Sequence, residues 1–165
     1  MKILALHTVD NYEGIILSLG SNIGDREGNL VAALVDLAKV VEIKNISSIY
    51  ESEALLVTDQ RSFYNIAIEI EYLKNAHDLL GEIKKIETNL GRKKTIRYGP
   101  RIIDIDIIFF GGQNISSEVL TIPHYGWKKR LFVLEPLCEI VEDFHISEFN
   151  IINQQIIKKG NINYK

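Results

Sequence analysis

The chain alternates short apolar runs with segments in which apolar residues recur every three or four positions. Residues 15–19 form an apolar run that ends at Gly20, which predicts a short buried strand. Over residues 26–41 the apolar positions follow helical spacing, with Asn22 or Asp25 as the N-cap, and this pattern predicts an amphipathic helix.

Two further strands and a second helix are expected in the middle of the chain. Residues 46–50 have the composition of a strand, and residues 63–72 alternate in the way of a strand with one exposed face. Asn75 is a suitable N-cap for a helix whose apolar stripe runs to Leu90, and Gly91 stands where a glycine often ends a helix.

The second half of the chain begins with a basic segment without apolar periodicity, residues 92–101, which predicts a loop. Residues 102–110 then predict a strand. Residues 133–137 fit either a last strand or the start of a short helix, and the polar tail from Ile151 is expected to have little structure.

The order strand, helix, strand, strand, helix, strand is typical of a ferredoxin-like α+β sandwich (βαββαβ). In this fold an antiparallel sheet carries its helices on one face. Residues 1–14 precede the pattern as an extension of unknown role, and residues 15–165 are expected to form a single domain.

Composition narrows the class of protein. The 165 residues are 46% apolar, which is enough for one sizeable core, and no run is long enough to span a membrane. A net charge of −3 argues against a general nucleic-acid binder. With one cysteine, Cys138, and no convincing export signal, we expect the protein to lie in a reducing cytoplasm. We also expect a monomer that binds neither nucleic acid nor a membrane.

Two acidic residues interrupt the largely apolar strand in the segment RYGPRIIDIDIIFFGG. Side chains two positions apart in a strand share a face, so Asp104 and Asp106 should point the same way, with carboxylates about 6–7 Å apart. Ile103, Ile105 and Ile107 should face the core. A solvent-exposed strand face is the simplest explanation of such a pair, and a divalent cation that relieves the mutual repulsion is the functional one.

The neighbouring loop favours the functional explanation. Its five cations, with no acid among them, are Arg92, Lys93, Lys94, Arg97 and Arg101. Carboxylates that hold Mg²⁺ beside arginines that bind phosphate oxygens are the groups that phosphoryl transfer needs. A solvated charge run remains the alternative for the loop taken alone.

The glycine-rich segment GSNIGDREG is not a recognised nucleotide-binding loop. It fits neither the P-loop pattern nor the dinucleotide-binding pattern, so Gly20, Gly24 and Gly28 are expected to serve turns and packing. If this protein uses ATP, cations and metal rather than a glycine cradle must hold the triphosphate.

Four blocks of the sequence together resemble a known family. They are LSLGSNIGDREGNL, FYNIAIEI, YGPRIIDIDIIFFGG and LTIPHYGWKKRLFVLEPLCEI, and they extend from about Ile15 to Ile140. The chain is similar to 6-hydroxymethyl-7,8-dihydropterin pyrophosphokinases of folate biosynthesis. The resemblance implies a ferredoxin-like fold and transfer of the diphosphate of ATP to the hydroxymethyl group of the pterin, with release of AMP.

The resemblance also implies roles for individual residues. Asp104 and Asp106 would hold two Mg²⁺ ions and, with Arg92 and Arg101, form the catalytic set. The residues implied for ATP binding are Glu87, Arg92, Lys94, Arg97, Tyr98, Arg101, Ile107, Thr121, His124, Tyr125 and Arg130. The residues implied for pterin binding are Gly20, Ser52, Ala54, Leu55, Phe63, Asn65 and Phe132, with the two phenylalanines stacking on the ring.

Some positions depart from the family pattern. The segment Ser52–Leu55 lacks the prolines common at the pterin pocket, Tyr98 replaces a tryptophan, and Lys84 takes a place where an amide is common. The altered pterin loop leaves open a catalytically silent member of the family. Because the ferredoxin-like fold hosts many functions, a regulatory or RNA-binding module is a second open alternative.

Overall fold

The computed structural model describes residues 11–54, 59–92 and 99–165. The strands are β1 (Ile15–Ser21), β2 (Glu42–Ile46), β3 (Ile49–Ser52), β4 (Phe63–Glu71), β5 (Asp104–Phe110), β6 (Ile115–Ser116), β7 (Thr121–Ile122) and β8 (Ile156–Gly160). The helices are α2 (Arg26–Leu37), α3 (Ala76–Asn89) and α4 (Leu131–Ile140), with short 3₁₀ turns at Trp127–Lys129 and Ile146–Glu148. No helix in the described ranges has the length and apolarity needed to cross a membrane.

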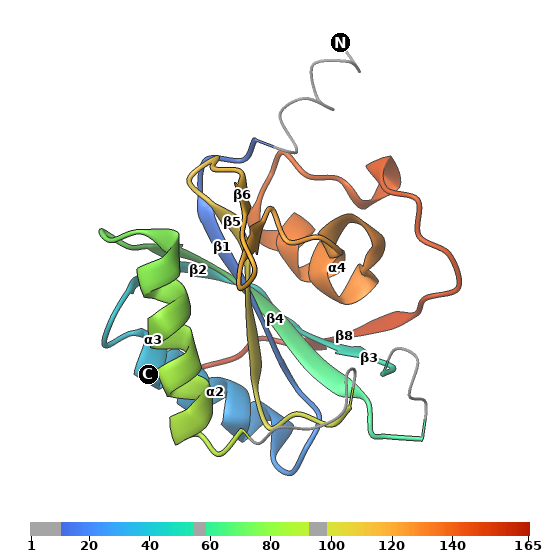
Figure 1. The fold of residues 1–165 in the computed structure, drawn as a ribbon. Helices are drawn as coiled ribbons and strands as arrows, with labels where there is room; N and C mark the ends of the chain where they lie inside the picture. Colours follow the sequence, from blue (N-terminus) through green and yellow to red (C-terminus); the bar gives the residue numbers. More distant parts are fainter. Residues whose placement is uncertain (1–10, 55–58, 93–98) are drawn as a thin grey trace.

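One antiparallel sheet organises the described part of the chain (Figure 1). Its strands follow the order β5-β1-β4-β3-β8, and β2 also pairs with β4. The central elements follow one another along the chain as β1, α2, β3, β4, α3 and β5. In the sheet, β1 lies between β5 and β4. This is the ferredoxin-like arrangement that the sequence predicted, and it is confirmed. β6 and β7 form a separate small hairpin.

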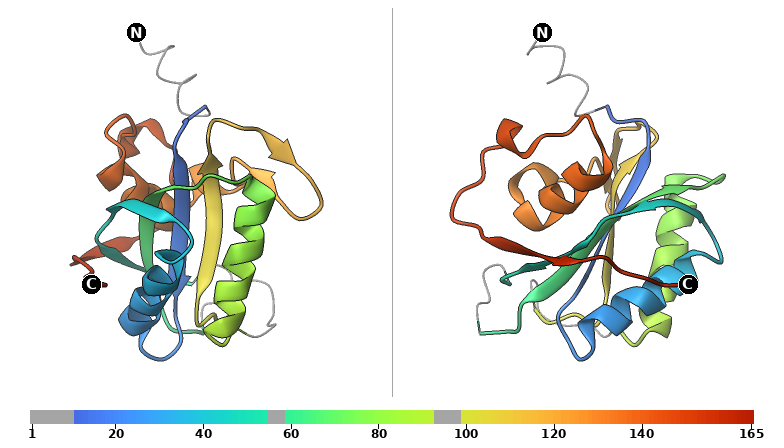
Figure 2. Two further views of the ribbon diagram at one scale, coloured as in Figure 1. Left: turned by 90° about the vertical axis from the view of Figure 1, so that its left-hand side faces the viewer. Right: turned by 180° about the vertical axis from the view of Figure 1, so that it is seen from behind.

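The helices cover both faces of this sheet, whereas one covered face was predicted. α2 and α3 lie on one side, over a core that includes Leu17, Ile66 and Ile105, and α4 lies on the other side (Figure 2). α4 covers a second apolar cluster around Phe109 and Trp127. The apolar run 133–137 thus belongs to a helix, and a run this short does not by itself distinguish helix from strand.

The strand predicted over residues 46–50 is wrong in its bounds. Two strands, β2 and β3, occupy this region, and both pair with β4. Between them, the Ser47 N–H donates to the Ala67 carbonyl and the Ser47 Oγ accepts from the Ala67 N–H at 2.9 Å. Because this serine replaces a regular ladder contact with its side chain, the strand breaks at residues 47–48.

The polar tail after Ile151 contains a strand, β8, that its composition did not predict. β8 pairs with β3 at the edge of the sheet, and most of its side chains are exposed. Because a backbone ladder needs no apolar side chains, the edge of β3 can recruit this Lys-rich segment. The expectation of weak structure beyond Ile151 was therefore wrong for residues 156–160.

The caps of both predicted helices are confirmed. The Asp25 carboxylate accepts a hydrogen bond from the Gly28 N–H and the Asn75 side chain accepts one from the Asp78 N–H, each at 2.9 Å. Gly91 follows α3 with a φ of +94°, as a C′ glycine requires. α2 ends at Leu37 rather than at residue 41, since the residues that follow form turns.

The alternation along β5 sets which side chains reach each face. Ile103, Ile105 and Ile107 belong to the core beneath α2 and α3, as the sequence predicted. Ile108 faces the α4 side by the same alternation as the aspartates, and an irregularity in the β1–β5 register between Ile16 and Leu17 places Phe109 on that side as well. Asp104 and Asp106 therefore share the face opposite the three core isoleucines.

Candidate active site

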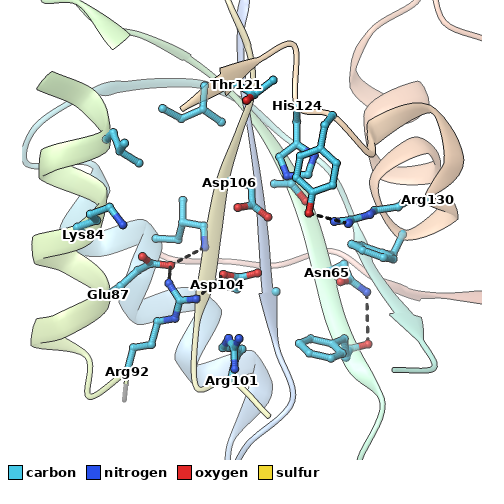
Figure 3. Close-up of a pocket in the computed structure, with 18 of the residues that line it drawn as sticks. Asn65, Lys84, Glu87, Arg92, Arg101, Asp104, Asp106, Thr121, His124 and Arg130 are labelled. Carbon is cyan, nitrogen blue, oxygen red and sulfur yellow. Dashed lines mark hydrogen bonds and ion pairs between the residues drawn. The ribbon is translucent and has the colours of Figure 1, made fainter. Parts of the chain in front are cut away.

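A cavity of about 510 Å³, the central pocket, opens on the α4 side of the sheet and extends to α3. Figure 3 shows Glu87 and Arg92 on one side of it, His124 and Arg130 on the other, and the two aspartates between them. The predicted site residues that line it are Gly20, Ser52, Phe63, Asn65, Glu87, Arg92, Arg101, Asp104, Asp106, Ile107, Thr121, His124, Tyr125, Arg130 and Phe132.

The other predicted site residues divide into two groups. Ala54 is described and buried, 5% exposed, but it does not line the central pocket. Leu55, Lys94, Arg97 and Tyr98 lie outside the residues that the structure describes.

The two aspartates face the pocket from neighbouring positions on β5. Asp106 lies opposite Ser18 of β1 in the strand register, and Asp104 lies opposite Gly20. Burial raises the pKa of each carboxyl group from 3.8 to about 6. Repulsion by Asp106 adds to the rise for Asp104, and repulsion by Glu87 adds to the rise for Asp106. Negative charge is therefore only partly compensated at this point of the pocket.

Glu87 joins the second helix to the start of β5. Its side chain is 6% exposed, and Oε2 accepts from the Ile105 N–H at 3.0 Å and from Arg92 Nη1 at 2.8 Å. Arg92 also lies 3.2 Å from Asp104 Oδ1 through Nη2, so one guanidinium bridges both acids. Burial raises the pKa of Glu87, and the Ile105 and Arg92 contacts oppose that rise.

His124, Tyr125 and Arg130 form the opposite wall. The Gly126 N–H donates to His124 Nδ1 at 3.2 Å, so the neutral ring carries its proton on Nε2. Burial, with help from Arg130, lowers the pKa of His124 to about 4, which keeps the ring neutral near pH 7. The His124 and Tyr125 rings stack at 4.6 Å, and Arg130 Nη2 donates to the Tyr125 hydroxyl at 3.4 Å.

Asn65 lies at the other end of the pocket and is 3% exposed. Its Nδ2 donates to the Tyr50 carbonyl at 3.0 Å and to Ser52 Oγ at 2.8 Å. Since a backbone carbonyl can only accept, the amide group is oriented with Oδ1 on the opposite side, toward Gly20. A carbonyl oxygen is thus the polar group that Asn65 offers to a ligand.

Gly20 leaves room for that ligand. A Cβ atom at this position would lie 3.3 Å from Asn65 Oδ1 and 3.4 Å from the ring of Phe63. Phe63 and Phe132 both line this end of the pocket, and the Arg130 guanidinium lies 5.9 Å from the centre of the Phe132 ring. Two aromatic rings and a buried amide suit a flat, polar heterocycle.

Sequence reasoning missed several residues that line the pocket: Ser18, Glu53, Leu80, Lys84, Gly99, Ile105, Glu118, Val119 and Leu120. For Leu80 and Lys84 a signal existed, because with Glu87 they follow helical spacing on one side of α3. Ser18 lies at the site because it pairs with Asp106 across β1 and β5, and no local sequence pattern predicts this pairing.

The donor set of the pocket suits a hard cation that also binds phosphate. No group of three or more His, Cys, Asp or Glu side chains that could hold a metal ion occurs within the described ranges. Mg²⁺ needs only one or two carboxylates when water and substrate phosphates complete its coordination, and Asp104 and Asp106 are such a pair. The Asp104 side chain is 37% exposed and so remains accessible from the pocket.

Comparison with known proteins gives a consistent result. The family described as 7,8-dihydro-6-hydroxymethylpterin-pyrophosphokinase (HPPK) matches residues 16–142, a range that contains every residue lining the central pocket. A 2-amino-4-hydroxy-6-hydroxymethyldihydropteridine pyrophosphokinase of Bacillus subtilis is 44% identical over 128 residues, which cover 76% of this chain and 77% of that protein.

Longer proteins match as well. A mitochondrial folate synthesis bifunctional protein of Pisum sativum is 41% identical over 130 residues, which cover 78% of this chain but 25% of the pea protein. A crystal structure of an HPPK-DHPS in complex with substrates superposes with a TM-score of 0.62 at 17% identity, covering 84% of this chain and 42% of the other. That likeness concerns the fold alone.

Proposed function

This chain belongs to the HPPK family, and we propose that the central pocket is where it transfers the pyrophosphoryl group of ATP to 6-hydroxymethyl-7,8-dihydropterin in folate synthesis. The observation that carries the proposal is the arrangement of the pocket: two under-compensated aspartates lie between Arg92 on one wall and Arg130 on the opposite wall, and Asn65, Phe63 and Phe132 line the other end. The two ends suit the two substrates.

The triphosphate is assigned to the space around the two aspartates, which is lined by Arg92, Arg101 and, on the opposite wall, Arg130. Arginine presents a planar array of donors that matches phosphate oxygens, and the neutral His124 ring offers the Nε2–H as a further donor. The adenine is assigned to the strip between α3 and β7, where Ile107 and Thr121 line the wall. Lys94 and Arg97 remain candidates for the same role on sequence grounds.

Asp104 and Asp106 would hold Mg²⁺ in the pocket. The fit rests on oxygen donors, on a shared strand face and on pKa values that burial and like charge have raised. When bound, the metal would supply charge neutralisation for the phosphates, which is the main requirement of phosphoryl transfer. The sequence resemblance implies two such ions.

The pterin is assigned to the end lined by Phe63, Asn65 and Phe132. The rings would stack on the two faces of the heterocycle, and Asn65 Oδ1 would accept hydrogen bonds from its N–H groups. In this pose the hydroxymethyl oxygen attacks the β phosphorus and releases its proton to solvent, the bond to the α,β-bridging oxygen breaks, and AMP leaves with that electron pair. Arg92 and Arg101 stabilise the charge that develops.

A nucleotide assay tests the proposal. The protein is incubated with ATP, Mg²⁺ and 6-hydroxymethyl-7,8-dihydropterin, and AMP is separated from ADP by chromatography. We expect AMP in amounts equal to the pterin diphosphate, with ADP no more than a trace, and no AMP when the pterin is omitted. Formation of ADP, or failure to form AMP by a folded protein that binds ATP, would contradict the proposal.

A further inference from the structure

The turn that follows β1 contacts the segments that lead into β4 and β5. Asn22 contacts both of them, whereas the Gly24 carbonyl accepts, among the described residues, only from Arg61 Nη1, at 2.8 Å. Its backbone N–H donates to the Arg101 carbonyl at 3.0 Å, and its Oδ1 accepts from the Arg101 N–H at 2.7 Å. On its other side, Nδ2 donates to Gln60 Oε1 at 2.8 Å and to the Arg61 carbonyl at 3.0 Å. One amide thus joins three segments that are distant in the sequence.

The Asn22 side chain is buried, and its hydrogen bonds hold it in one position. It is 3% exposed, and both its oxygen and its nitrogen have partners. If either neighbouring segment moved away, a buried polar atom would lose its hydrogen bond, which is one of the more unfavourable events in a protein interior. The positions of the two segments are therefore linked through this side chain.

The two linked segments lead directly into the two ends of the central pocket. Arg101 lines the pocket and precedes Asp104 at the start of β5, while Gln60 and Arg61 precede Phe63 at the start of β4. Asn22 therefore stands between the groups assigned to the nucleotide and those assigned to the pterin. It belongs to the GSNIGDREG segment, which neither substrate assignment uses beyond Gly20.

We propose that Asn22 is a positioning residue that couples the binding of the two substrates, an inference that rests on the proposed function. A nucleotide that orders Arg101 also orders Gln60 and Arg61 through the shared amide. The pterin then meets a β4 start that is already in place, so its binding requires less ordering. By linkage, bound pterin strengthens nucleotide binding by the same factor.

The test measures this factor directly. The dissociation constant of 6-hydroxymethyl-7,8-dihydropterin is determined by calorimetry with and without saturating Mg²⁺ and α,β-methylene-ATP, for wild type and Asn22→Ala. We expect the nucleotide to tighten pterin binding by about 10-fold or more in the wild type, within the usual range for coupled sites, and by less than about 3-fold in the variant. Each substrate alone should bind both proteins with similar affinity.

Asn29→Ala is the matched control. The Asn29 side chain also donates to this turn, to Ser21 Oγ at 3.1 Å and to the Ile23 carbonyl at 2.7 Å, but among the described residues none of its hydrogen bonds reaches the starts of β4 or β5. Its removal should lower the melting temperature and leave the coupling factor at the wild-type value. A loss of coupling equal to that of Asn22→Ala would reduce Asn22 to a general stabiliser of the turn and overturn the inference.

If Asn22→Ala does not fold, Gln60→Ala is the variant to measure. Gln60 is half-buried, and the substitution removes one hydrogen bond of the Asn22 amide. Partial loss of coupling supports the inference, and an unchanged factor overturns it. Failure of the proposed function is seen separately, as absence of AMP formation by the wild type. If the wild type forms AMP and binds both substrates without coupling, the inference alone is wrong.

Discussion

Two groups of carboxylates in this protein occupy opposite electrostatic situations. Hydrogen bonds and nearby cations lower the pKa of Glu51 and of Glu139 below the ordinary value of 4.5. Burial raises the pKa of Asp104 and Asp106 to about 6, and the surrounding cations do not cancel that rise. The first pair is stabilised as ions by the fold, and the second pair is not.

The Glu51 carboxylate has its hydrogen-bond and charge partners within the protein, and we call such a site complete. Ser62 Oγ donates to its Oε2 at 2.8 Å and Arg26 Nη1 donates to the same oxygen at 3.0 Å. Arg26 also donates to the Ser62 carbonyl at 3.0 Å and lies 3.8 Å above the ring of Tyr64. Each charge here has a partner within the chain.

Glu139 is satisfied in the same way. Burial acts to raise its pKa, but the Ser48 N–H at 2.6 Å, the Tyr50 hydroxyl at 2.8 Å and Lys158 at 3.3 Å outweigh that effect. This carboxylate ties α4 to β3 and β8. Asp104 and Asp106 receive less from the protein, and this difference supports the Mg²⁺ site proposed above.

The largest expected effect is the loss of turnover on removal of a pocket acid. Asp104→Ala and Asp106→Ala should each reduce AMP formation by about 10³-fold or more, because the charge on the phosphates is no longer balanced. Glu139→Gln, which removes a carboxylate from a completed site, should leave turnover near that of the wild type. Circular dichroism checks that all three variants fold, and near wild-type rates for both aspartate variants would refute the metal assignment.

The second comparison is between two arginines. Arg92→Ala should slow turnover by about 10²–10³-fold, since a contact to the developing phosphate charge is lost. Arg26→Ala should instead lower the free energy of unfolding by roughly 1.5–3 kcal/mol, because its charge-assisted hydrogen bonds to Glu51 and Ser62 are lost. Steady-state kinetics and urea titrations of both variants separate the two effects. Arg92→Ala also leaves the buried Glu87 without its cation, so the distinction lies in turnover: a loss of turnover in folded Arg26→Ala as large as that of Arg92→Ala would remove it.

The smallest expected effect is on stability as a function of pH, measured as melting temperature in EDTA. The folded pKa of Asp106 lies above its unfolded value, so ionisation destabilises the fold fully above about pH 6 and not at all below pH 3.8. Asp106→Asn should therefore melt a few degrees higher than the wild type at pH 8, at about 2–4 °C per kcal/mol, and at an equal temperature near pH 3.8.

Glu139→Gln should show the opposite sign. Because the folded pKa of Glu139 is below 4.5, its carboxylate stabilises the fold above pH 4.5, and this contribution is lost as the pH falls through the folded value. The variant should melt below the wild type at pH 8, with a difference that shrinks on acidification. Equal signs for the Asp106 and Glu139 variants at pH 8 would contradict the contrast between their sites.

Parts of the fold and site were predictable because they depend on local periodicity. The two-residue alternation along β5 placed Asp104 and Asp106 on one face and Ile105 on the other, and the structure agrees. Helical spacing and side-chain caps placed α2 and α3, and the family resemblance indicated most residues that line the central pocket.

Other parts depend on contacts between distant segments. The pattern of residues 133–137 did not reveal which face of the sheet α4 would cover, and the polar tail did not reveal that β8 would pair with β3. Glu87 was expected at the nucleotide site, but its hydrogen bond to the Ile105 N–H requires α3 to lie beside the free edge of β5. No spacing in the sequence encodes such a contact.

By itself, the sequence of this protein determined the order of the central βαββαβ elements, the faces of β5 and the residue types available for phosphate, metal and heterocycle. These follow from interactions between near neighbours along the chain. The tertiary structure alone decided that Asn22 joins the starts of β4 and β5, and that burial leaves Asp104 and Asp106 with raised pKa values. Desolvation and hydrogen-bond partnership depend on what surrounds a group in space, and that environment exists only once the chain has folded.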